Sequence, residues 1–484
     1  MLTRLQLQNL YESDPDKFFE LYSDMHFMII STQDQIDELK AEIKKLKDQK
    51  NKDSHNSSKP PSTDGYNKPA PKSLRTKTGR KPGGQPGHKG CTLKRIEKPD
   101  EIIIDVPRIC NACSRDLSVA EITGYETRQV LDIPPLKITC TEYRAQKLKC
   151  TCGATTTGSF PQNVTEAVQY GPNIKSAVTY LKVNQLLPYK RTSEIFRDLF
   201  NFEISSGTLH NMIEACAAKL KPVYNEIGAL IKKAKVIGFD ETGIRTDGYL
   251  QWLHTAVTER LTHYTPHAKR GYEGISASGI LTGFTGVAVH DGWASYNGFD
   301  CEHALCNVHH LRELTAFKED GQQWADDMIT LLIKIKNSVR QAKQQNLDKL
   351  NMAQITDLDK QYQNIIHAGY SLHPPPQKLD KSKRGRVKNS PERNLLKRLD
   401  EHKESVLKFM YDFDVPFGNN LSEQAIRMIK VRQKVSGCFR SSDGAEIFCI
   451  IRTYIASLKK QGYSIYAALQ MINQHIPQTV NLSA

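Results

Sequence analysis

Two apolar runs that each end in an aspartate constrain the fold of this chain most. Residues 235–242, KVIGFDET, reach Asp240, and residues 280–291 reach Asp291. Short apolar runs of this kind are typical of buried strands, so we expect each aspartate at the end of a strand. A strand pair is expected between them, around residues 250–264. The strands would then bring two carboxylates to one edge of a sheet in a mixed α/β domain.

A third acid, Glu423, stands far downstream in residues 416–427, PFGNNLSEQAIR, a pattern typical of a capped helix start. Hard cations such as Mg²⁺ or Mn²⁺ need oxygen ligands, and a pair of them can activate water or a 3′-hydroxyl and stabilise a leaving oxygen. Three convergent carboxylates would suffice to hold them. Simpler interpretations remain: Asp240 could cap a strand and Asp291 could form a turn. Glu423 could pair with Arg427 along its helix.

The size and charge of the chain limit what kind of protein it can be. Its 484 residues exceed the size at which one hydrophobic core stops growing, so several domains are expected. Lys and Arg total 67 against 53 Asp and Glu, and this net charge of +14 favours a polyanion such as nucleic acid or a membrane surface. No apolar run approaches the roughly 20 residues that cross a bilayer, and no signal pattern is present. We expect a soluble, cytoplasmic protein without a membrane partner.

The first 95 residues are expected to form an N-terminal helix or coiled coil followed by a linker. In residues 1–50, apolar side chains recur at alternating spacings of three and four, with Thr32 polar in the series, which is typical of a short coiled coil. They are Ile29, Ile36, Leu39, Ile43 and Leu46. A lone amphipathic helix packed on its own domain would show the same pattern. Residues 51–95, rich in Lys, Ser, Pro and Gly, are expected to form a basic, disordered linker, which could equally contact phosphates.

Residues 96–165 are expected to form a β-rich zinc ribbon, with a strand-like apolar run at residues 102–106 and an alternating stretch at residues 138–148. Four of the 11 cysteines lie in two close pairs, which suits a metal site in a reducing compartment better than a disulfide framework. The pairs are Cys110 with Cys113 and Cys150 with Cys152. Four thiolates satisfy tetrahedral Zn²⁺, and the ion would hold together a segment too small for its own core. The second pair has C-x-C spacing, which gives a tighter turn than C-x-x-C, so Cys140 or Cys91 could replace one of its cysteines as a ligand. The four cysteines could also bind no metal.

Residues 166–232 are expected to form a helix-turn-helix module. Two helical stretches, about 191–200 and 206–220, flank a short connection. Four polar side chains occupy the first turns of the second stretch, where a recognition helix contacts base edges. They are Ser206, Thr208, His210 and Asn211. A helical hairpin that only packs within the protein would show the same pattern.

Several motifs, taken together, resemble the insertion sequence 66 (IS66) family of bacterial transposases. Besides the cysteine pairs they are GRKPGGQPGHKG (79–90), LPYKRTSEIF (187–196), GFDET (238–242), HDGWASY (290–296), CNVHHLREL (306–314), RGRVKNSPERNLLKRL (384–399) and VPFGNNLSEQAIR (415–427). The resemblance spans nearly the whole chain. It implies an RNase H-like catalytic domain over residues 233–430, with a helical insertion over about 315–410 and a C-terminal helical region over 431–484. The DDE triad of the family falls on Asp240, Asp291 and Glu423.

The resemblance implies a DNA transposase. Such an enzyme binds the terminal inverted repeats of its element, cleaves DNA by metal-dependent hydrolysis and joins the freed 3′-hydroxyl to target DNA. We expect Mg²⁺ or Mn²⁺ at the triad, a structural Zn²⁺, a homo-oligomer associated with the nucleoid, and accessory proteins of the element as possible partners. Phosphate contacts are expected from residues 381–388 and from the helix that carries Glu423, at Arg427, Lys430 and Arg432. The alternative is a catalytically inactive zinc-ribbon and helix-turn-helix regulator derived from a transposase.

Two further features come from the comparison with the family. Its C-x-x-H signature is matched by Cys306 and His309, which could be half of another metal site, could position the scissile phosphate, or could have a structural role. Gly418 and Ser422 stand where family members more often have an acid and an alanine. Because neither is a triad residue, an active enzyme is expected.

Overall fold

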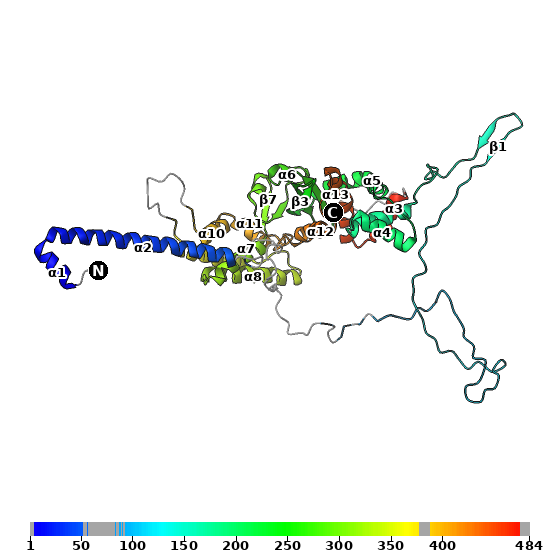
Figure 1. Ribbon diagram of the computed structural model, residues 1–484, viewed down its shortest axis with the longest axis horizontal. Coiled ribbons are helices and arrows are strands. Elements are labelled where there is room, and N and C mark those ends of the chain that lie inside the picture. The colour runs from blue at the N-terminus through cyan, green and yellow to red at the C-terminus, as the bar shows by residue number, and fades with distance from the viewer. Residues whose placement is uncertain are drawn as a thin grey trace. The chain divides into compact units, whose positions relative to one another are not determined.

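The structure is a computed structural model that describes residues 4–51, 56, 83, 87–88, 90, 92–376 and 388–474 (Figure 1). Most of the predicted linker, Cys91 and residues 381–387 of the predicted basic run 381–388 lie outside the described residues. The chain divides into two units. The larger one comprises Met1–Lys72, Glu166–Tyr189 and Gly207–Ala484, and the smaller one comprises Ser73–Thr165 and Lys190–Ser206.

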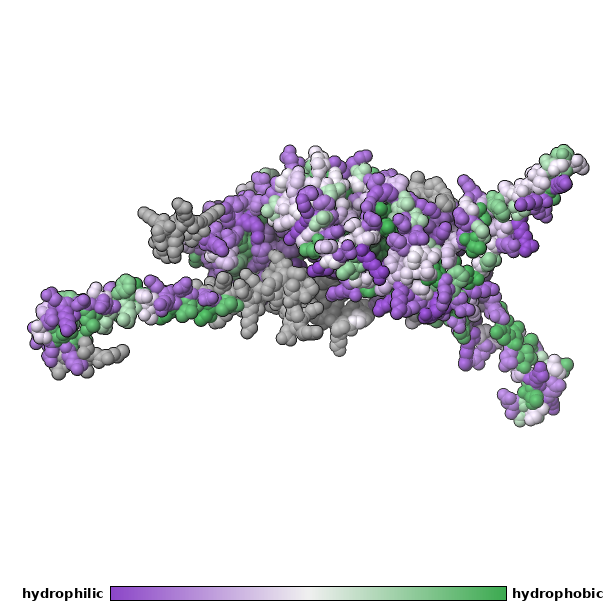
Figure 2. All heavy atoms as spheres, turned by 45° about the horizontal axis from the view of Figure 1, so that its top comes forward, coloured by the Kyte–Doolittle hydropathy of each residue, from purple (hydrophilic) through white to green (hydrophobic). Residues whose placement is uncertain are grey.

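Two helices, α1 (Arg4–Ser13) and α2 (Pro15–Asn51), form the start of the chain. The 37 residues of α2 extend the predicted apolar series back to Tyr22 and Met25, so its alternating three- and four-residue spacing covers about four heptads. These apolar side chains are exposed, and Figure 2 shows apolar residues gathered along the helix. Self-association through this stripe stays a prediction.

A five-stranded sheet forms the centre of the larger unit, in the order β5-β4-β3-β6-β7. Its strands are β3 (Val236–Thr246), β4 (Tyr249–Val257), β5 (Thr262–His267), β6 (Val287–His290) and β7 (Glu302–Leu305). β3, β4 and β5 are antiparallel neighbours, whereas β3, β6 and β7 run parallel. The β3–β4 hairpin turns through Asp247 and Gly248, both with positive φ, which is typical of an Asp-Gly type I′ turn.

The predicted strand end at Asp240 was wrong, because β3 continues past it to Thr246. Beyond Asp240 the buried residues Ile244 and Thr246 alternate with more exposed ones, so this half of β3 is the half-buried arm of an antiparallel hairpin rather than a loop. The parallel neighbour β6 pairs only with residues 236–238. Asp240 therefore lies just past the end of the parallel pairing.

Helices cover both faces of the sheet. On one face, Ile237, Phe239 and Ala288 pack with Ile227 and Ile231 of α5 (Ser206–Lys232). The other face is covered by a helical insertion that shares a core with Val287 and Val289 of β6. Its helices are α7 (Asn307–Glu319), α8 (Gln323–Gln344), α9 (Met352–Leu372), α10 (Pro391–Glu401) and α11 (Lys403–Tyr411). The short helix α6 (Tyr272–Ser276) lies between β5 and β6 in the sequence.

Three helices follow the insertion: α12 (Asn420–Ser436), α13 (Ser442–Lys460) and α14 (Ile465–Asn473). α13 lies along the edge strand β5, where Ser457 Oγ and Thr453 Oγ1 accept hydrogen bonds from Thr262 N and Tyr264 N. α14 packs on α3 (Pro172–Thr179), which is continued by a π-helical turn, Tyr180–Asn184. None of the described helices combines the length and the apolar character that crossing a bilayer requires.

The smaller unit has less regular structure than its sequence predicts. Within residues 92–165 the described strands are β1 (Lys147–Lys149) and β2 (Thr155–Thr157), paired antiparallel, so the expected strand at residues 102–106 is absent from this described segment. Ile102, Ile103 and Ile104 are exposed. β-branched residues favour extended backbone, but a strand also needs a partner edge for its hydrogen bonds. α4 (Tyr189–Phe200) continues into this unit, where Ser193 Oγ donates to Ile204 O at 2.7 Å.

Candidate active site

Asp240 and Asp291 come from neighbouring strands and lie at the same edge of the sheet. Asp240 pairs with Thr255 across β3 and β4, and its Oδ1 accepts a hydrogen bond from Glu241 N at 2.9 Å. Asp291 directly follows β6, and its Oδ1 accepts one from Trp293 N at 3.0 Å. Gly292 takes a φ of +88°, which lets the chain turn away immediately after the acid. Asp240 lies just past the parallel pairing of β3 with β6 and Asp291 directly follows β6, so the two acids lie on neighbouring strands. Their joint role as cation ligands stays a prediction.

Glu423 lies in the first turn of α12, and the start of that helix is fastened to β3. Asn419 Nδ2 donates to Phe239 O at 2.6 Å. The approach depends on Gly238, because a Cβ there would lie 2.5 Å from Ser422 Oγ and 2.6 Å from Asn419 Oδ1. The glycine two residues before Asp240 thus lets the helix that carries the third acid reach the strand that carries the first.

Asp240, Asp291 and Glu423 are not among the described groups whose ligand atoms all lie within 4.8 Å of one another. The pKa of Asp240 nevertheless responds to the acids around it. It is raised to about 8, first by burial and then by the charges of Glu241, Asp291 and, more weakly, Glu423, against one backbone hydrogen bond that lowers it. Carboxylates that repel each other in a buried place favour either a bound proton or a bound cation. Both alternatives relieve the same repulsion, so the site has the electrostatic character of a cation-binding site.

Glu241 forms a second buried acidic position that sequence reasoning missed. Its side chain is 2% exposed and accepts hydrogen bonds from Arg270 Nε and Nη2 at 3.0 and 2.8 Å and from the Tyr296 hydroxyl at 2.7 Å. The Arg270 guanidinium lies 4.0 Å from the ring centroid of Trp293, two residues after Asp291. The network ties the loop after β6 to β3. Its one sequence signal is the position of Glu241 beside Asp240 in GFDET.

Cys306 and His309 lie beside Glu423. One ligand atom from each of the three residues falls within 4.8 Å of the others. Cys306 precedes α7, and its Sγ accepts a hydrogen bond from Asn419 N at 3.2 Å. Burial raises the pKa of the Cys306 thiol and lowers the pKa of His309. The C-x-x-H signature is therefore part of the same site as the third acid.

Gly418 and Ser422, the two departures from the family pattern, both lie in closely packed surroundings. A Cβ at Gly418 would lie 2.7 Å from Val308 Cγ2, so a larger residue there would push the chain away from α7. Ser422 is fully buried against Gly238. Neither position displaces a triad acid.

The predicted DNA-contacting residues fall into two groups. Ser206, Asn211, Arg427 and Lys430 are exposed, and Thr208 and His210 are half-buried. His210 Nδ1 lies 3.2 Å from the Tyr189 hydroxyl, and Lys430 Nζ donates to Gly243 O at 2.9 Å.

Arg432 differs from the other residues expected to contact phosphate. It is 8% exposed, stacks on Phe439 with 3.3 Å between Cζ and the ring centroid, and donates to Gly437 O at 3.0 Å. Its guanidinium stabilises packing inside the protein, which leaves little of its surface for the expected phosphate contact.

The two cysteine pairs each lie on a tight turn. Ser114 N donates to Cys110 O at 2.8 Å, and Gly153 N donates to Cys150 O at 2.9 Å. Backbone N–H donors and the neighbouring thiol lower the pKa of Cys110 and of Cys150, which favours the thiolate form that binds metal. Among the described residues, the group of three or more ligand atoms within 4.8 Å of one another is the one at Glu423. The four thiols of the two turns therefore do not come together as one group of ligands.

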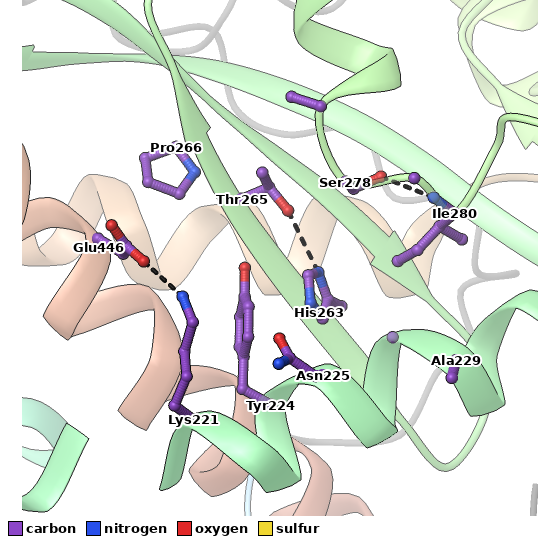
Figure 3. A pocket seen from close by; sticks show the side chains of 13 residues that line it. Lys221, Tyr224, Asn225, Ala229, His263, Thr265, Pro266, Ser278, Ile280 and Glu446 are labelled. Atoms are coloured by element: carbon purple, nitrogen blue, oxygen red, sulfur yellow. Dashed lines mark hydrogen bonds and ion pairs between the residues drawn. The ribbon is translucent and has the colours of Figure 1, made fainter. Parts of the chain in front are cut away.

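A polar cavity of about 510 Å³ lies elsewhere in the larger unit, between α5, β5 and α13 (Figure 3). Its polar side chains already pair with one another: Lys221 Nζ with Glu446 at 2.5 Å and Thr265 Oγ1 with His263 Nδ1 at 3.2 Å. Burial lowers the pKa of His263 to about 3, so the ring is neutral at physiological pH. No predicted site residue lines this cavity.

Known proteins identify the family of the chain. Residues 167–447, more than half of the 484, match the Transposase IS66 family, and residues 107–153 match the zinc-finger binding domain of transposase IS66, which supports a structural zinc. Residues 6–94 match a family of unknown function. An uncharacterised protein of Sinorhizobium fredii, y4jD, is 22% identical over 416 residues, 80% of this chain and 78% of that protein. The resemblance in the motifs is confirmed, and the chain belongs to the IS66 family of transposases.

Proposed function

We propose that the chain is a DDE transposase in which Asp240, Asp291 and Glu423 hold two divalent cations, Mg²⁺ or Mn²⁺. The observation that carries the proposal is the close packing of α12 on β3 at Gly238, which joins an acid more than 130 residues downstream of Asp291 to the sheet edge. The donors are all carboxylate oxygens, as hard cations require. When bound, the cations would activate water or a 3′-hydroxyl and stabilise the leaving oxygen.

The strand order supports an RNase H-like catalytic domain. Three antiparallel strands followed by two parallel ones, in the order β5-β4-β3-β6-β7, place the first acid on the central strand and the second after its parallel neighbour. The helical insertion stands between the second and third acids, as the family resemblance implies.

The protein groups around the triad act by position and charge. Burial and the Glu241–Arg270–Tyr296 network hold the loop of Asp291 against β3. Glu241 is paired with Arg270, so it needs no cation of its own, and its remaining charge raises the pKa of Asp240. The acids are thus held in place before a substrate arrives, which lowers the cost of ordering them during the reaction.

DNA binding is assigned to surfaces outside the triad. Ser206, Thr208, His210 and Asn211 would contact element ends, while Arg427 and Lys430 would contact phosphate beside the third acid. A zinc ion held by the four cysteines of residues 110–152 would order the ribbon. The enzyme would act in the cytoplasm on the nucleoid as a homo-oligomer, with terminal inverted repeats and target DNA as its substrates.

The test is cleavage of paired element ends in Mg²⁺ by the wild type and by Asp240→Asn, Asp291→Asn and Glu423→Gln. We expect each variant to lose at least about a hundredfold in cleavage rate while DNA binding is retained, because each loses a cation ligand. Asp247→Asn is the matched control, since it makes the same change in the exposed β3–β4 turn. Unimpaired cleavage by Asp240→Asn would refute the assignment. A wild type that binds ends but never cleaves them would favour the regulator.

A further inference from the structure

Cys306, His309 and Glu423 form a compact set of three different donor atoms. A sulfur, an imidazole nitrogen and a carboxylate oxygen lie within 4.8 Å of one another. Cys306 and His309 stand at the start of α7, and Glu423 is in the first turn of α12. The helical insertion separates these positions in the sequence, so the fold brings together the two ends of the insertion.

Two of the three side chains carry a buried polar atom without a hydrogen-bond partner in the described part of the chain. The atoms are His309 Nδ1 and Glu423 Oε1. Leaving such atoms unpaired inside a protein is unfavourable, and natural structures rarely do so without an ion, a water or a functional reason. The third side chain contributes Cys306 Sγ, which receives the Asn419 N–H at 3.2 Å.

The donor types indicate which ions would fit. Mg²⁺ binds oxygen and does not favour thiolate, whereas Zn²⁺ accepts thiolate, imidazole and carboxylate together. Three protein ligands satisfy three of the four positions of a tetrahedral ion and leave one for a small ligand. Two anionic donors and a neutral imidazole also balance the charge of a divalent cation.

We propose that Cys306, His309 and Glu423 bind a divalent transition-metal ion of the zinc class, at a site separate from the four cysteines of residues 110–152. The ion ties α12 to α7 and thereby fixes the position of Glu423. This consequence for Glu423 rests on the proposed function, but the binding of the metal does not require cleavage.

The experiment measures the metal content of the full-length chain. Protein stripped of metal is loaded with Zn²⁺ without Mg²⁺, freed of excess ion and analysed, and a parallel sample is loaded with Co²⁺ for its thiolate charge-transfer absorption. The wild type is expected to retain about two zinc ions and Cys306→Ser about one, because serine is a poor ligand for zinc. Cys301→Ser is the matched control, since this nearby cysteine lies outside the group.

A background variant isolates the site. Cys110→Ser with Cys113→Ser removes the first pair of the ribbon, and its remaining Co²⁺ absorption should have the intensity of a single thiolate and disappear when Cys306→Ser is added. A folded background variant that binds no zinc, or a Cys306→Ser variant with the wild-type metal content, overturns the proposal. If Cys306→Ser unfolds in the metal-free state, His309→Asn decides by the same criterion.

The outcomes separate this proposal from the proposed function. A wild type that cleaves element ends in Mg²⁺ but binds only the ribbon zinc would overturn the second site and leave the transposase assignment intact. If the wild type binds both zinc ions and Asp240→Asn cleaves as fast as the wild type, the second metal site stands and the assignment of the catalytic triad fails.

Discussion

Gly238 sets how closely the helix of the third acid approaches the sheet. We predict that Gly238→Ala lowers the free energy of unfolding by about 1–3 kcal/mol and sharply reduces cleavage, because the added methyl group overlaps Ser422 Oγ and Asn419 Oδ1. Denaturant titration and the cleavage assay measure the two effects. A Gly238→Ala variant with normal stability and normal cleavage would show that α12 need not lie so close.

Ser422→Ala is the informative control at the same contact. The Ser422 hydroxyl is buried and has no hydrogen-bond partner among the described residues. Removing it relieves an unsatisfied group and leaves the helix in place, so stability should be unchanged or rise by up to about 1 kcal/mol, with cleavage retained. The alanine that family members more often carry here fits this expectation.

The raised pKa of Asp240 predicts how cation binding depends on pH. Since the pKa rises from its ordinary value of 3.8 to about 8, the cation must displace a proton below pH 8. Mg²⁺ affinity, measured by calorimetry between pH 6 and 9, should increase about tenfold per pH unit and level off above pH 8. A flat profile in the wild type would contradict a protonated Asp240, and Asp240→Asn should itself be flat.

The same shift affects stability in the absence of the cation. An acid with a raised pKa in the folded state favours folding most below its ordinary pKa, and that contribution is lost as the pH rises from near 3.8 to about 8. Added Mg²⁺ should restore stability most at the upper end of this window, because there it replaces a proton that has already left.

At the scale of helices and strands, local patterns predicted the elements well where one face is buried. The apolar run before Asp240 is a strand, whereas of the run at residues 280–290 only Val287–His290 forms one. The helices α7–α11 occupy the stretch where the helical insertion was expected. The end of β3 was missed because an exposed hairpin arm does not look apolar. Residues 102–106 were expected in a strand because their pattern is β-like, but pairing depends on a distant partner that local sequence does not reveal.

The helix α2 has an exposed apolar stripe from Tyr22 to Leu46 with the spacing of a coiled coil. We therefore predict that Leu39→Asp lowers the oligomeric state of the full-length chain. A buried charge at such a core position should raise the dissociation constant at least about a hundredfold. Sedimentation equilibrium gives the measurement, and Ser31→Asp, at an outer position of the helix, is the control. Equal association of both variants would mean that the stripe packs elsewhere.

At the scale of the whole chain, the candidate active site was predictable only in part. The three acids could be proposed from their motifs, but periodicity does not show that Cys306, His309 and Glu423 meet. His309 lies in the first helix of the insertion, whereas Glu423 follows its last one. The contact depends on the fold of the intervening helices and on Gly238. The Glu241–Arg270 pair was missed for the same reason, since Arg270 carries no motif of its own.

The two units also differ in what stabilises them. The larger one has two extensive apolar cores around its sheet. In the smaller one, most large apolar side chains of residues 92–165 are exposed, so this segment has little core with which to oppose the entropy of its chain. A metal that joins the two cysteine turns is the physical means by which such a segment can become ordered.

This difference predicts a selective effect of zinc loss. Cys150→Ser should cost about one zinc ion per chain and weaken binding to element ends, while the unfolding transition of the larger unit stays unchanged, because its cores do not involve the ribbon. Metal analysis, DNA-binding titrations and thermal unfolding measure the three quantities. Cys140→Ser is the matched control, an exposed cysteine outside both pairs. Zinc retention by Cys150→Ser together with zinc loss by Cys140→Ser would show that Cys140 is the fourth ligand, whereas zinc retention by both would argue against a four-cysteine site.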